Sequence, residues 1–129
     1  MSNSNTSWKD LIERLISFGI TIIVISNKIQ RNYTGNHLRQ QLIRSGTTPA
    51  LNYAEARFAE SKKDFVHKAK IVLKELQETR VCIMLIMRSE MSNGFEEFRQ
   101  LLEENGELIA IFVSSVNTAQ KSFKKEIDK

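Results

Sequence analysis

Apolar residues, with one threonine among them, recur every three or four positions through residues 65–86. The intervals run 4, 3, 4, 3, 4 and 3 along Phe65, Ala69, Val72, Leu76, Thr79, Ile83 and Ile86. This spacing places all of these side chains along one side of an α-helix, whereas a strand would divide them between two faces. We therefore predict a long amphipathic helix here, packed against other helices.

Two further segments have apolar residues at the same spacing, a pattern that we call a seam. The first begins at Ser7, whose hydroxyl can cap a helix that has an acid, Asp10, three positions later. Its seam consists of Leu11, Leu15, Phe18, Ile22, Ile25 and Ile29. The last follows a predicted turn over residues 89–94, with Asn93 and Glu96 as its cap. Its seam consists of Phe98, Leu102, Ile109, Phe112, Val116, Ala119 and Phe123.

A fourth predicted helix, rich in small residues, lies between the first helix and the helix that contains residues 65–86. It follows a predicted turn over residues 32–36, and its small side chains let a neighbouring helix approach closely. Pro49 lies in the middle of this segment and removes one backbone hydrogen bond, so we expect a kink or an interruption there. Ser61 and Asp64 then cap the helix that contains residues 65–86.

Three features complicate this all-helical interpretation. Residues 19–25 have strong strand propensity, which we take to be overridden by the seam spacing. Asn105 and Gly106 form a weak point at which the last helix could break. The first helix has a second apolar face, which indicates either a buried central helix or a subunit contact. That face consists of Trp8, Ile12, Ile16, Ile20 and Ile23.

Length and turn content agree with these assignments. A chain of 129 residues suits one domain, and one proline with five glycines means few turns and long helices. The predicted fold is all-α, an antiparallel up-down-up-down four-helix bundle. We expect a single domain over residues 1–129, with a flexible N-terminus over residues 1–6 and a basic tail over residues 124–129.

The composition also bears on location and chemistry. The single cysteine, Cys82, cannot form an internal disulfide, so we expect a reducing cytoplasm and a buried, unreactive thiol. The most apolar stretch, residues 15–25, is too short for a bilayer, which takes about 20 apolar residues. A net charge of +4 permits nucleic-acid binding without requiring it. The sequence contains no phosphate-binding loop or nucleophile elbow, and we predict no cofactor and no metal.

Several stretches carry a family resemblance. They are RSGTTPALNYAEA at residues 44–56, SKKDF at residues 61–65, LKELQET at residues 73–79 and ELIAIF at residues 107–112. They resemble the bacterial four helix bundle protein family, also called the 23S ribosomal RNA intervening-sequence protein family, over residues 38–121. The most specific part is Asn-x-x-Glu-Ala, which begins at Asn52, followed by Ser-Lys-x-Asp-Phe. The chain departs from the family at Thr48 and Pro49, where the family usually has serine followed by a β-branched residue.

The resemblance implies an antiparallel four-helix bundle that assembles into a homopentamer. One branch of the family consists of accessory proteins of diversity-generating retroelements, which bind nucleic acid and a reverse transcriptase through a basic surface. Other members lie within ribosomal RNA insertions and have no settled biochemical role. The implied partners are therefore other copies of this chain, RNA or DNA, and a protein such as a reverse transcriptase.

Candidate site residues fall into two groups. Six basic residues are predicted to contact the phosphate backbone, because no base-reading or aromatic stacking motif is visible. They are Arg39, Arg44, Arg57, Lys62, Lys63 and Lys68. Four polar residues at helical spacing are predicted to be structural pins between the second and third helices. They are Asn52, Glu55, Glu75 and Glu78.

The leading hypothesis is a non-enzymatic, oligomeric bundle that binds nucleic acid or a protein partner through a composite surface. One alternative is a purely structural assembly protein, with the second apolar face of the first helix as its subunit contact. The other is a metal-dependent enzyme built on Glu55, Glu75, Glu78 and His67. The sequence itself indicates no reaction.

Overall fold

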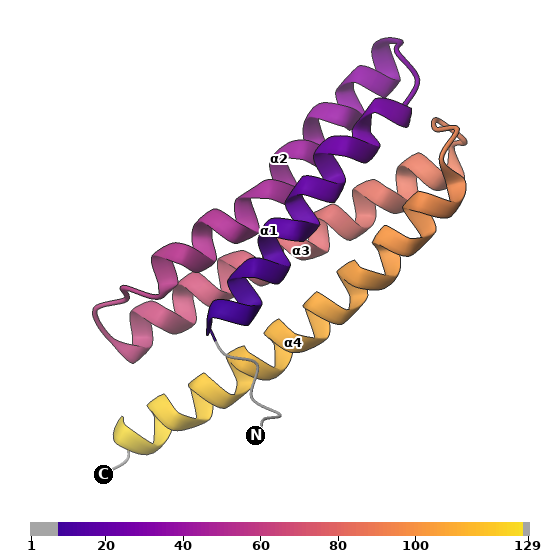
Figure 1. Ribbon diagram of the computed structural model, residues 1–129. Coiled ribbons are helices and arrows are strands. Elements are labelled where there is room, and N and C mark those ends of the chain that lie inside the picture. The colour runs from indigo at the N-terminus through magenta and orange to yellow at the C-terminus, as the bar shows by residue number, and fades with distance from the viewer. Residues whose placement is uncertain (1–7, 128–129) are drawn as a thin grey trace.

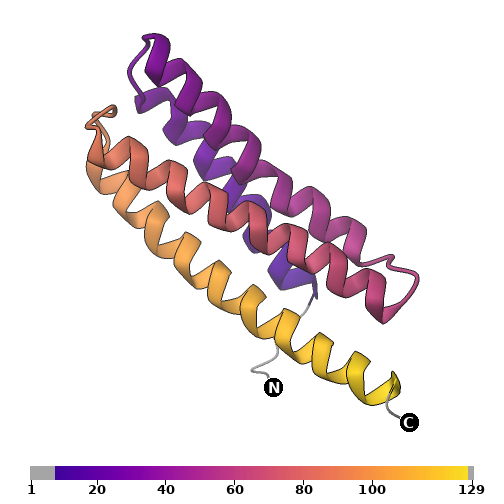
Figure 2. The ribbon, with the colours of Figure 1, turned by 180° about the vertical axis from the view of Figure 1, so that it is seen from behind.

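The computed structural model describes residues 8–127 as four long helices joined by short connections. They are α1 (Trp8–Ile25), α2 (Tyr33–Ala56), α3 (Lys62–Arg88) and α4 (Phe95–Ile127), with one short 3-10 helix, η1 (Ser26–Lys28), after α1. Successive helices run in opposite directions, and α1 packs against both α2 and α4 (Figures 1 and 2). The predicted all-α, up-down-up-down four-helix bundle is confirmed. Residues 1–7, which include the predicted cap Ser7, and residues 128–129 lie outside the described part.

The predicted seams form most of the core. In α3, the seam is buried from Ala69 to Ile86, and only Phe65 at its start is half-buried. In α4 the buried ridge differs from the predicted one, because Leu101, Asn105 and Leu108 are buried where Leu102 and Ile109 are only half-buried. The side chain of Phe123 lies outside the described part of the structure. The strand propensity of residues 19–25 produces no strand, since all of them belong to α1.

Helix α1 ends before the last residue of its predicted seam. Ile29 follows η1 in an extended conformation, is buried, and forms an antiparallel bridge with Ser92. Two backbone hydrogen bonds flank this bridge: Gln30 N donates to the Met91 carbonyl at 2.8 Å, and Asn93 N donates to the Lys28 carbonyl at 3.1 Å. The α1–α2 and α3–α4 connections are thereby tied together at one end of the bundle (Figure 1).

The helix starts show one confirmed cap and two corrections. Ser61 Oγ accepts from Asp64 N at 3.0 Å, as predicted for α3. The predicted turn over residues 32–36 is wrong, because Asn32 accepts from Gly35 N at 2.7 Å and so caps α2 from Tyr33 onward. Helix α4 begins at Phe95, so Asn93 is too early in the chain to be its cap.

Neither helix is interrupted at the expected point. Helix α2 continues through Pro49, which is buried, while the Thr47 and Thr48 hydroxyls donate to carbonyls one turn earlier. Helix α4 continues through Asn105, whose Nδ2 donates to the Leu76 carbonyl of α3 at 2.9 Å. Packing against neighbouring helices therefore outweighs the local preference for a break. Within residues 8–127, every helix falls short of the combination of length and hydrophobicity that crossing a bilayer demands.

Small residues bring α1 and α2 together, as predicted for this segment. A Cβ atom at Gly46 of α2 would lie 2.1 Å from Cδ1 of Ile22, which is fully buried in α1. A Cβ atom at Gly19 would lie 3.6 Å from the Gly46 carbonyl oxygen. The absence of a side chain at Gly46 thus creates the space that Ile22 fills.

We expect Gly46→Ala to lower the free energy of unfolding by about 1–2 kcal/mol, because the added methyl overpacks the crossing and outweighs the gain in helix propensity. Gly106→Ala in α4 is the matched control: its Cβ would lie 3.4 Å from Nη1 of Arg80, and we expect no loss, or a gain of up to about 1 kcal/mol. Urea unfolding measures both. Equal behaviour of the two variants would contradict the tight crossing.

Candidate functional site

Polar contacts join α2 to α3 along their length. Asn52 Nδ2 donates to Glu75 Oε1 at 2.6 Å, and Arg44 forms a 2.8 Å ion pair with Glu78. Between them, Thr79 Oγ1 donates to Ser45 Oγ at 3.0 Å, and both residues are buried. Three of the four predicted pins therefore lie in inter-helix contacts. The fourth, Glu55, is exposed, and its carboxylate makes no hydrogen bond or ion pair within the described residues.

The residues of the metal-enzyme hypothesis do not gather into a metal site. Glu75 contacts Asn52, Glu78 contacts Arg44, and His67 is exposed on α3. In the part of the chain that the structure describes, no group of three or more His, Cys, Asp and Glu side chains is arranged to hold a metal ion. Glu75 and Glu78 of α3 thus make helix-to-helix contacts in place of a ligand shell.

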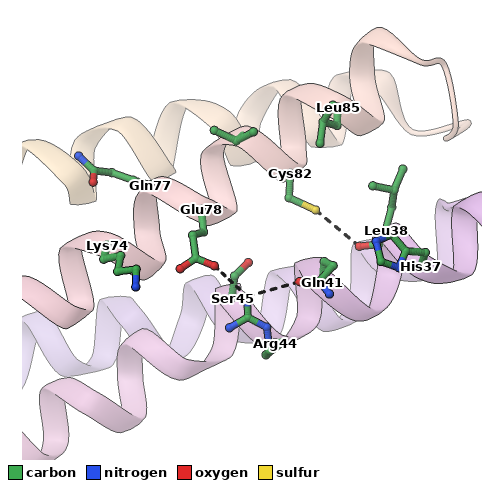
Figure 3. A pocket seen from close by; sticks show the side chains of 11 residues that line it. His37, Leu38, Gln41, Arg44, Ser45, Lys74, Gln77, Glu78, Cys82 and Leu85 are labelled. Atoms are coloured by element: carbon green, nitrogen blue, oxygen red, sulfur yellow. Dashed lines mark hydrogen bonds and ion pairs between the residues drawn. The ribbon is translucent and has the colours of Figure 1, made fainter.

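A groove of about 520 Å³ runs between α2 and α3 (Figure 3). We call it the α2/α3 groove. The apolar side chains of Val81 and Leu85 line it and are exposed, and its rim carries Arg44, Lys74 and Glu78. The remaining lining residues are His37, Leu38, Gln41, Ser45, Gln77 and Cys82. The signal for this groove in the sequence is Val81 and Leu85, which are four positions apart and off the main seam of α3.

Cys82 lies at this groove but is not reactive. Its side chain is buried, and Sγ donates to the Leu38 carbonyl at 3.6 Å (Figure 3). Burial raises the pKa of the thiol to about 11, an effect that Arg44 only partly opposes. The thiolate is therefore scarce at neutral pH, and the predicted buried thiol is confirmed.

A second groove, of about 630 Å³, lies between α1 and α4. This α1/α4 groove is lined by apolar residues, among them Phe18, Ile20, Val24 and Leu101, and its rim carries Lys28, Glu97 and Glu104. Ion pairs connect its two sides: Arg14 contacts both carboxylate oxygens of Glu104 at 2.7 and 2.8 Å, and Lys28 lies 3.1 Å from Glu97. The Glu104 carboxylate is the main cause of a raised Arg14 pKa, with Glu107 adding to it.

Four aliphatic side chains of α1 form an apolar strip beside this groove. They are Ile16, Ile20, Ile23 and Val24, with exposed fractions of 40, 55, 51 and 63%. This α1 strip is separate from the buried stripe of the same helix, which includes Leu15, Phe18 and Ile22. It contains three residues of the second apolar face that the sequence predicts, while Ile12 is buried and Trp8 is half-buried.

Four of the six predicted phosphate-contacting residues have partners within the bundle: three arginines, and Lys62, which is described below. Arg39 donates to the carbonyls of Ser26, Ile29 and Gln30, so it holds the α1–α2 connection, and burial is the main cause that lowers its pKa. Arg44 pairs with Glu78, as described above. The Arg57 guanidinium lies 4.7 Å from the centroid of the Trp8 ring.

Trp8 continues this contact into the core. Its ring stacks on Tyr53 at 5.9 Å, and Tyr53 meets the edge of Phe112 at 5.3 Å. Burial raises the pKa of Tyr53. The column of Arg57 and three aromatic rings therefore joins α1, α2 and α4 at the end of the bundle opposite the bridged connections.

The other three candidate cations lie at that same end. Lys62, at the start of α3, donates to Ser122 Oγ near the end of α4 at 2.8 Å, which places the two helix ends side by side. Arg39 lies on α2, and Arg57 directly follows the end of that helix, 18 positions later. This is about 27 Å along the helix axis, so the six residues do not form one patch. Antiparallel packing instead creates what we call the basic end. It consists of Arg57, Lys62, Lys63, Lys68, Lys121, Lys124 and Lys125.

Four antiparallel helices, with polar contacts at the interface between α2 and α3, define an all-α helical-bundle protein. The chain belongs to the family described as the 23S rRNA-intervening sequence protein, whose model matches residues 10–114. This confirms the resemblance found in the sequence.

One solved structure shows the same fold. It is the 1.70 Å crystal structure of a protein with unknown function from the S23 ribosomal protein family of Bacteroides thetaiotaomicron. The two chains are 24% identical, the match covers 85% of this chain and 97% of the other, and the TM-score is 0.76. No functionally curated protein matches the sequence.

We expect Asn52→Asp to lower the free energy of unfolding by about 1–2 kcal/mol at pH 7. The hydrogen bond to Glu75 would be lost, and the new carboxylate would repel that of Glu75. Paired carboxylates bind a proton more readily in the folded protein than in the unfolded chain. The pKa of the pair is therefore raised on folding, and the loss should shrink as the pH falls below about 5. Urea unfolding at pH 7 and pH 4 measures this difference.

Glu55→Gln is the matched control for this substitution. Because Glu55 is exposed and its carboxylate makes no hydrogen bond or ion pair in residues 8–127, we expect a change below about 0.5 kcal/mol at either pH. A loss for Asn52→Asp that is the same at both pH values would show that the contact with Glu75 is not its cause.

Proposed function

We propose that this chain is a non-enzymatic scaffold that assembles with copies of itself and binds a partner through the assembled surface. The α1 strip carries the proposal. A helix of an isolated bundle needs one apolar stripe, and the core stripe of α1 already supplies it. Four large aliphatic side chains that remain together at the surface mark an interaction site, because covering them removes apolar area from water.

What the family resemblance implies favours self-assembly over another use of this strip. The resemblance implies a ring of five copies, and we propose that stoichiometry for this chain. Leu51 of α2 and Phe58 after it are single exposed side chains. Val81 and Leu85 of α3 form a pair, whereas the α1 strip has four exposed side chains over two turns. A contact built on it would therefore bury four side chains at once.

A second function, phosphate binding, is favoured by the basic end. Lys63, Lys124 and Lys125 are exposed, and the antiparallel arrangement of α3 and α4 brings them to one end of the molecule. In an assembly, the basic ends of the copies would together form a larger positively charged surface than one copy has. Binding through such a surface would be directed at the phosphate backbone, with little dependence on base sequence.

For self-assembly, we expect Ile20→Glu to reduce the mass measured by light scattering to that of one chain, 14.9 kDa, because a charge cannot be buried in an apolar contact. Leu51→Glu introduces the same charge at an exposed leucine outside the α1 strip and should leave the assembly intact. Circular dichroism verifies that both variants remain folded. A wild-type mass of one chain would refute the proposal.

For phosphate binding, we expect a single-stranded RNA oligomer to bind less tightly as salt is raised. The double variant Lys63→Gln, Lys124→Gln should weaken binding and lower the slope of log affinity against log salt. The control double variant, Arg31→Gln, Arg99→Gln, removes two charges at the opposite end and should bind like wild type. Equal effects of the two double variants would show that the basic end is not the site.

A further inference from the structure

The surface holds a second apolar region that the bundle itself does not cover. Val81 and Leu85 of α3 are 57 and 53% exposed and line the α2/α3 groove. The helices pack in the cyclic order α1, α2, α3, α4, so this groove lies on the side of the bundle opposite the α1/α4 groove (Figures 1 and 2). The molecule thus has one apolar surface on each of two opposite sides.

We propose that the α1 strip of one copy docks into the α2/α3 groove of the next copy. This inference rests on the proposed function and names the two surfaces that would make the self-contact. If copies instead met through α1 alone, about a twofold axis, the α2/α3 groove would stay uncovered on both partners. A head-to-tail contact covers both apolar surfaces in one interface and leaves one of each available for the next copy.

One surface is a ridge and the other is a hollow. The α1 strip projects from a single helix, with Ile16, Ile20 and Ile23 at intervals of four and three positions. The α2/α3 groove is a hollow of about 520 Å³ between two helices, and Val81 and Leu85 line it. Figure 3 shows it with Leu85 labelled. A ridge of large side chains on one helix fitting between two others is the usual way in which helices pack.

The charges around the two surfaces are also complementary. The α1/α4 groove, beside the α1 strip, has Glu97, Glu104 and Lys28 on its rim. Arg14 pairs with Glu104 and Glu107 at the same groove, so three acids and two bases surround it. The α2/α3 groove has two bases and one acid, and Arg88 adds a further base in the hollow next to it, which Val81 and Leu85 also line. Opposite signs around two apolar surfaces favour their contact with each other and disfavour contact of either with itself.

A mixing experiment tests this pairing. In a head-to-tail assembly, Ile20→Glu destroys the strip and keeps the groove, while Leu85→Glu destroys the groove and keeps the strip. We expect each variant alone to have the mass of one chain, 14.9 kDa. An equal mixture should form a complex of two chains and nothing larger, because each complex retains one intact contact. Light scattering at the concentration at which wild type is fully assembled measures all three samples.

The controls separate this inference from the proposed function. Both positions are more than half exposed, so the variants should keep the helical circular dichroism of wild type. If Leu85→Glu assembles like wild type, or if the mixture stays at one chain, the pairing is overturned while self-assembly stands. If wild type itself has the mass of one chain, the proposed function fails first. Because Leu51→Glu keeps both surfaces, its mixture with Ile20→Glu should still contain complexes larger than two chains.

Discussion

The close crossing of α1 over α2 determines how the other helices are arranged. Gly46 leaves room for Ile22, so α1 lies against α2 at the middle of the bundle. On its other side α1 contacts α4 through long charged side chains, since Arg14 contacts Glu104 and Lys28 contacts Glu97. Because these charged side chains are long, the two helices stay far enough apart to leave a groove between them. The apolar residues of α1 that point away from the core therefore stay at the surface.

The contact between α2 and α3 creates the opposite surface in a different way. Here polar pairs join the helices, with Ser45 and Thr79 buried and Asn52 contacting Glu75. These pairs hold α2 and α3 together without Val81 and Leu85, which remain exposed along the groove. Both ends of the bundle are closed separately, by the backbone bridge at Ile29 and Ser92 and by the aromatic column that starts at Trp8. The fold is thus complete without using either apolar surface.

Much of this architecture can be predicted from the sequence, because a seam of period 3.5 records which side of a helix is buried. The seam of α3 and the Ser61 cap are local patterns, and both appear as predicted. The failures occur where tertiary contacts decide the outcome. Pro49 and Asn105 remain inside helices because neighbouring helices pack on them. Asn32 caps a helix that begins earlier than the turn signals indicate.

The candidate site is less predictable for the same reason. Basic residues are visible in the sequence, but their partners are not, so Arg39 could not be recognised as a support for a loop. The meeting of the α3 start with the α4 end depends on antiparallel packing and joins two clusters that are far apart in the chain. The family match identifies the kind of protein, while the apolar and basic surfaces that the bundle leaves uncovered are the basis of the function that we propose.

An experimental structure of the assembled protein tests the central claim most directly, through the exposed fraction of the α1 strip. The account predicts that Ile16, Ile20, Ile23 and Val24 become buried against Val81 and Leu85 of a neighbouring copy. It would be contradicted by an assembly in which these four side chains still face solvent.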